Sequence, residues 1–135
     1  MYNETGGLVN KPVSLREKNM SIGVVIWTTC TLSVPADLPS SDSWKNYGRA
    51  DWAYESTTWQ VLVEPTKTKT IPSEIKELNS NISNGLMAVV EPSRTEEAAY
   101  KFLNSVAVSV AHKCGGAVLQ GPMGVVQLNE SGEEI

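Results

Sequence analysis

The chain has 135 residues, and 11 basic against 15 acidic residues give it a net charge of −4. This length predicts one compact domain, and 41% hydrophobic with 19% charged residues excludes the disordered class. The acidic balance argues against a nucleic-acid binder, which needs a basic face against phosphate. No apolar run approaches the roughly 18 residues of a transmembrane helix, so no membrane span is expected.

The chain divides into an arm, a domain and a tail. Residues 1–19 are polar and form an N-terminal arm, and residues 20–129 are predicted to form a single domain. Residues 130–135 are an acidic tail that is expected to fray.

Two cysteines, Cys30 and Cys114, bear on the compartment. Residues 1–19 lack the apolar core of a secretory signal, which indicates a cytoplasmic protein. Thiols are kept reduced in that compartment, so both cysteines are predicted to be free.

The first half of the domain reads as strands. A continuous apolar run at 22–27 is typical of a central strand covered on both faces. The Pro- and Ser-rich stretch 33–43 predicts an irregular surface connection. Alternation from Trp52 onward then predicts a strand or hairpin arm that leads into a strand at 59–63.

A short helix is predicted to begin at Pro72, which suits a first helical position because it lacks an N–H. Its apolar stripe would consist of Ile75, Leu78 and Ile82. The pair at 84–85, Asn-Gly, would end this helix.

The second half contains the strongest helix signal. A buried strand is predicted at 86–90, and a helix follows in which Ser93 and Glu96 form a capping box. The Gly-Gly pair at 115–116 ends that helix, and residues 117–128 are predicted to form a hairpin. The order predicts an α/β fold: a two-layer α/β sandwich, with a mixed sheet of about five or six strands and two helices on one face.

Two strands end in the same Glu-Pro-hydroxyl pattern, at residues 61–66 and 88–93. If these strands are parallel neighbours, Glu64 and Glu91 lie at one sheet edge, where paired carboxylates bind a metal or share a proton. The simpler interpretation is that each Glu-Pro ends its strand. No His or third acid at ligand spacing accompanies the pair, so we favour the simpler interpretation and predict no metal and no cofactor.

The sequence offers few residues that could act as a catalytic nucleophile or base. His112 and Cys114 are nucleophile-like neighbours, but positions i and i+2 of a helix do not face each other. His112 is the sole histidine, so no other dyad with histidine is available. We expect His112 to interact with the helix dipole and Cys114 to pack as a small hydrophobe. The chain is therefore not expected to be an enzyme.

Five of the nine aromatic residues fall between positions 44 and 59. Exposed aromatic rings with neighbouring charges are typical of protein interfaces. The sequence predicts a partner-binding surface made of Trp44, Tyr47, Asp51, Trp52 and, at its rim, Glu55.

The exposure of these rings is expected to differ. Trp44 and Tyr47 are predicted to be exposed in a loop. Two of the three residues Trp52, Tyr54 and Trp59 are predicted to cover the core face of the sheet.

The C-terminal third carries a resemblance. The strand at 86–92, a helix with Phe102 and Leu103, and the Gly-Gly pair at 115–116 resemble the C-terminal half of bacterial immunity-type proteins. The resemblance implies a cytoplasmic protein that binds and neutralises a cognate toxin. No site residue carries over from it.

The leading hypothesis is thus a non-enzymatic protein-binding protein of the immunity type. One alternative is a small-ligand or metal-dependent enzyme that uses Glu64 and Glu91. Another is a structural or oligomerisation module.

Overall fold

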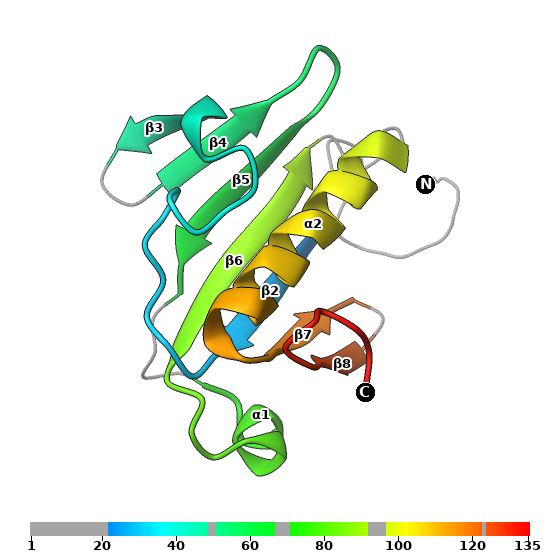
Figure 1. Ribbon diagram of the computed structural model, residues 1–135. Coiled ribbons are helices and arrows are strands. Elements are labelled where there is room, and N and C mark those ends of the chain that lie inside the picture. The colour runs from blue at the N-terminus through cyan, green and yellow to red at the C-terminus, as the bar shows by residue number, and fades with distance from the viewer. Residues whose placement is uncertain (1–21, 49–50, 67–70, 92–96, 123) are drawn as a thin grey trace.

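A computed structural model describes residues 22–48, 51–66, 71–91, 97–122 and 124–135 (Figure 1). They form a seven-stranded sheet and two α-helices. In chain order the elements are β2 (Ile22–Thr28), a 3-10 turn (Ser41–Ser43), β3 (Trp44–Gly48), β4 (Asp51–Glu55), β5 (Gln60–Pro65), α1 (Ser73–Leu78), β6 (Asn84–Glu91), α2 (Glu97–Cys114), β7 (Ala117–Gly121) and β8 (Gly124–Leu128).

The sheet has the order β3-β4-β5-β6-β2-β7-β8, and every neighbouring pair of strands is antiparallel. The α/β class with two helices is confirmed, but the sheet is larger than predicted and is not mixed. The second difference lies in the pairing of β5 with β6, in which Gln60 pairs with Glu91 and Pro65 with Leu86, so that the two strands run in opposite directions.

Helix α2 lies across β6 and β2 on one face of the sheet (Figure 1). Its buried residues recur at helical spacing and pack on alternate strand residues to form the main core. The helix ends where predicted, because Gly115 and Gly116 take φ values of 76° and 135°. The capping box at Ser93 and Glu96 lies outside the described residues.

A smaller cluster packs on the opposite face, where Trp27 and Val118 meet Ile75 and Ile82. Ile75 belongs to α1, but the helix ends at Leu78, so Ile82 lies beyond it. The predicted helix is therefore too long, and residues 84–85 begin β6 instead of ending α1. The reason is that the Ser83 N–H already bonds the Thr28 carbonyl, which extends the β2–β6 ladder.

Cys30 and Cys114 form a disulfide with a Cα–Cα distance of 5.4 Å. The prediction of free thiols is wrong because β2 and α2 end at the same side of the molecule, although the two cysteines are 84 positions apart in the sequence. The bond also removes Cys114 as a nucleophile. Within the described part of the chain, neither helix has the length and apolarity needed to cross a membrane.

The C-terminal residues are held in place and not frayed. Glu134 forms a bridge with Leu128, and the Ile135 N–H donates to the Gln127 carbonyl. The Asn129 side chain accepts bonds from two backbone N–H groups of the tail. The last residues thus turn back beside β8.

Candidate functional site

The face of the sheet opposite α2 is hollowed over β4, β5 and β6 into a groove of about 290 Å³, the open-face groove. Alternation places Leu62, Met87 and Val89 on this face, because Val61 and Ala88 belong to the core under α2. These three side chains are only partly buried. The lining residues are Tyr47, Asp51, Trp52, Leu62, Val63, Glu64, Met87, Val89 and Glu91.

Two carboxyl groups face each other at one end of the open-face groove. Trp52 pairs with Val63, so Asp51 and Glu64 take the next cross-strand position on β4 and β5. A hydrogen bond with Asp51, together with partial burial and the charge of Asp51, raises the pKa of Glu64 above its ordinary value. Such a bond requires a proton on one carboxyl. Glu64 therefore holds its proton more tightly than an isolated glutamate does.

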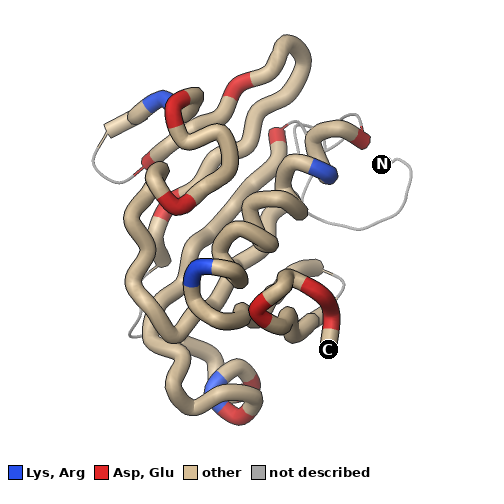
Figure 2. Tube along the Cα trace, viewed as in Figure 1, with Lys and Arg blue, Asp and Glu red and all other residues tan. Residues whose placement is uncertain are grey.

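Glu55 has partners of its own on β3. The Tyr47 hydroxyl donates to its carboxylate, and Lys45 Nζ lies 3.0 Å from Oε1. The hydrogen bonds from Tyr47 and Lys45 hold the pKa of Glu55 below its ordinary value. Lys45 is thus paired with Glu55. The charged residues on β4, β5 and the end of β6 are all acidic (Figure 2).

The predicted partner-binding residues divide between surface and core. Tyr47 is 55% exposed and lines the open-face groove with Asp51, while Glu55 is exposed beside them. Trp52 also lines the groove, although it packs against the main core. Tyr47, Asp51 and Trp52 are therefore brought together.

Trp44 is not at the surface. It is 6% exposed, donates Nε1–H to the Pro39 carbonyl, and contacts the rings of Tyr54 and Phe102. The predicted exposure is wrong because Trp44 begins a strand and pairs with Tyr54 on the face that α2 covers. Trp52, Tyr54 and Trp59 all pack against that core, one residue more than the two predicted to do so.

Glu64 and Glu91 are not brought together. Their strands are antiparallel, so the common edge that the alternative interpretation requires does not exist: Glu64 pairs with Met87, and Glu91 lies four residues further along β6. That offset is about 13 Å. Glu91 instead accepts a hydrogen bond from Gln60. Among the described residues no group of three metal-ligating side chains occurs.

Sequence reasoning missed the floor of the groove. The run that contains Leu62 is predicted only as a strand, and the run that contains Met87 and Val89 only as a buried strand, with no face assigned as open to solvent. One signal was present, since Glu64 alternates in phase with Leu62. A charged residue in that phase indicates a face open to solvent.

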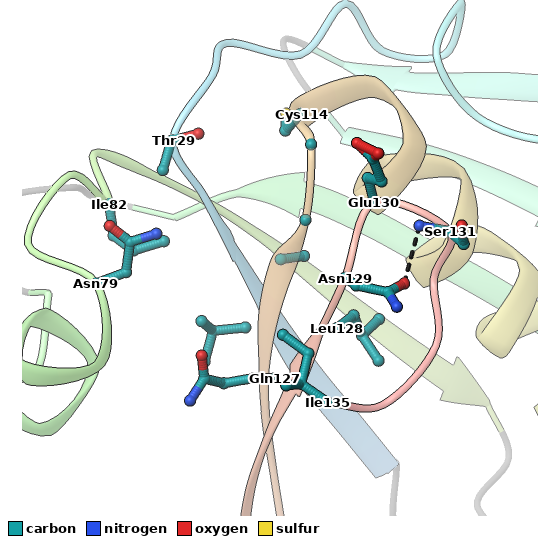
Figure 3. A pocket seen from close by; sticks show the side chains of 14 residues that line it. Thr29, Asn79, Ile82, Cys114, Gln127, Leu128, Asn129, Glu130, Ser131 and Ile135 are labelled. Atoms are coloured by element: carbon teal, nitrogen blue, oxygen red, sulfur yellow. Dashed lines mark hydrogen bonds between the residues drawn. The ribbon is translucent and has the colours of Figure 1, made fainter.

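A second cavity, of about 560 Å³, lies where α2 ends against β7, β8 and the turn after α1 (Figure 3). Its lining includes Gly115 and Gly116, which follow the disulfide-bonded Cys114. Asn129 there accepts a bond from the Ser131 N–H. Its lining residues are Thr29, Asn79, Ile82, Cys114, Gly115, Gly116, Ala117, Val118, Gln127, Leu128, Asn129, Glu130, Ser131 and Ile135. Glu130 is the one charged side chain in this lining. We therefore assign no catalytic or binding role to the second cavity.

No family model, no curated protein and no solved structure matches this chain. The open-face groove is therefore the feature from which a function is inferred.

The carboxyl pair makes a prediction about stability and pH. A raised pKa in the folded state means that stability is lost as pH rises from the ordinary value, near 4.5, through the raised value. We expect Glu64→Gln to remove this loss, so that at pH 7 the variant is more stable than the wild type by up to about 0.5 kcal/mol. Urea unfolding at pH 4 and pH 7 measures it. Glu77→Gln, on α1, is the control, and a Glu64→Gln protein less stable than the wild type at pH 7 would contradict the prediction.

Proposed function

We propose that this chain is a non-enzymatic protein-binding protein that holds a basic partner against the open-face groove. The observation that carries the proposal is an apolar floor bordered by carboxylates and an exposed tyrosine. Leu62, Met87 and Val89 form the floor, and Asp51 and Glu64 stand at one end. Apolar area at the centre with charge at the rim is typical of a protein interface.

The charges favour a basic partner over other partners. The whole chain carries a net charge of −4, and Lys45 on the same side is paired with Glu55. Carboxylates at a rim attract a positive surface and repel nucleic acid or an anionic membrane. A cognate toxin domain that the chain neutralises, as the resemblance of the C-terminal third implies, has the required chemistry if its contact surface is basic.

The disulfide favours an oxidising compartment for this encounter. Disulfides persist outside the cytoplasm, in a periplasm or at a cell surface, and are rare in cytoplasmic proteins. The bond between Cys30 and Cys114 therefore replaces the cytoplasmic expectation in this proposal.

A matched pair of substitutions tests the function. Leu62→Arg places a bulky cation on the groove floor, whereas Leu78→Arg makes the same change at an exposed site on α1. In cells that express the product of the adjacent gene as the candidate toxin, we expect the wild type and Leu78→Arg to protect growth and Leu62→Arg to fail. Thermal melting of the purified variants establishes that each is folded. Full protection by a folded Leu62→Arg chain, or none by the wild type, would overturn the proposal.

A further inference from the structure

The open-face groove combines two properties along a short distance. Its floor is apolar at Leu62 and Met87, and Glu64 is the cross-strand partner of Met87. Asp51 then faces Glu64 across β4 and β5. An apolar surface thus leads directly into a pair of carboxyl groups.

The carboxyl pair has no cation of its own in the described part of the chain. The ion pairs found there join Lys45 to Glu55, Lys101 to Glu97 and Lys113 to Asp37. Like charges directly opposite each other in a sheet are destabilising. The arrangement becomes favourable when a positive group enters between them.

We infer that the groove recognises its basic partner through one lysine or arginine side chain, whose aliphatic stem lies on Leu62 and Met87 and whose charge sits between Asp51 and Glu64. This inference rests on the proposed function and specifies its contact. A long cationic side chain is amphipathic, so it places its stem on apolar surface and its head at a polar rim. Its head also gains charge-assisted hydrogen bonds to two carboxylates.

A free divalent cation fits the same end less well. Calcium takes six to eight oxygen ligands, whereas the described residues contain no group of three acidic or other metal-ligating side chains. The apolar floor would also contribute nothing to a metal ion. A side chain uses both the floor and the carboxyl pair.

The contact also makes binding depend on pH. Protonation of Glu64 competes with entry of the cation, because the cation favours the charged form of the carboxylate. Affinity for the cationic side chain is therefore expected to fall as pH falls below the raised pKa of Glu64.

Two matched peptides test this contact by NMR titration of the full chain. The probes are acetyl-Leu-Lys-Leu-amide and the same peptide with its lysine acetylated, which keeps the stem and removes the charge. At pH 7 we expect the lysine peptide to shift the amide signals of Glu64 and Met87 and to bind at least fivefold more tightly. At pH 4 the difference should shrink below twofold.

Two protein variants and a titration with calcium chloride complete the experiment. The double variant Asp51→Asn/Glu64→Gln should bind both peptides alike, and Glu77→Gln should keep the fivefold difference. Equal binding of the two peptides to the wild type would overturn the inference. So would calcium chloride that shifts the same signals and displaces the lysine peptide at equal concentration. If Leu62→Arg fails to protect cells while the peptides bind alike, the proposed function stands and this contact is wrong.

Discussion

Replacing both Cys30 and Cys114 with serine is expected to lower the free energy of unfolding by about 4 kcal/mol. The disulfide closes a loop in which the cysteines are 84 residues apart, and a cross-link over such a loop removes much of the entropy of the unfolded chain. The bond joins the connection after β2 to the last turn of α2. Because α2 forms one side of the main core, the loss should be felt by the whole domain.

Denaturant unfolding with and without a phosphine reductant measures this effect. Reductant should bring the wild type to the stability of the double serine variant and should leave that variant unchanged. A loss below about 1 kcal/mol would show that the bond contributes little, contrary to the loop-closure argument.

Ile75→Ala is expected to cost about 3 kcal/mol of unfolding free energy. Ile75 is 0% exposed and packs with Trp27, Ile82 and Val118 on the face opposite α2. Its removal leaves a cavity where a six-residue helix has one buried side chain to hold it on the sheet. Helix α1 should therefore lose most of its attachment.

Leu78→Ala, on the same helix, is the matched control because Leu78 is 43% exposed. Its cost should stay below about 1 kcal/mol. Thermal and urea unfolding followed by circular dichroism compare the two variants. Equal costs would mean that the packing of Ile75 is not what fixes α1.

Local signals in the sequence predicted most of the elements. The apolar run of β2, the stripe of α2 and the turn between β7 and β8 were each recognised from residues near one another. The end of α2 followed from Gly115 and Gly116, where positive φ values favour glycine. These features depend on the spacing of apolar residues and on the φ preference of glycine. Both can be recognised within a single segment of the sequence.

Contacts between distant segments could not be predicted in this way. The direction of β6 relative to β5 depends on how the chain returns, and the disulfide depends on where β2 and α2 end. The burial of Trp44 likewise follows from its pairing with Tyr54 under α2. Strand direction, the disulfide and the burial of Trp44 each depend on two or more segments, so one segment alone does not predict them.

Only some residues of the open-face groove could be predicted, because the groove also depends on contacts between distant segments. Tyr47 and Asp51 were chosen as an aromatic and a charge in a polar segment, and both line the open-face groove. The floor was missed, because an apolar run does not tell which face of its strand stays open. A pairing of Glu64 with Glu91 was the alternative to the favoured interpretation that each Glu-Pro ends its strand, whereas the sheet order gives Glu64 the neighbour Asp51.

Two dissociation constants show whether the open face of the sheet is the surface that binds the partner. Isothermal titration calorimetry with the product of the adjacent gene gives one value for Leu62→Arg and one for Leu78→Arg. We predict that the Leu62→Arg complex is weaker by at least about 100-fold, or roughly 2.7 kcal/mol, because an interface loses that much when its centre is disrupted. A ratio near one between the two variants would show that the partner does not bind over the groove floor at Leu62.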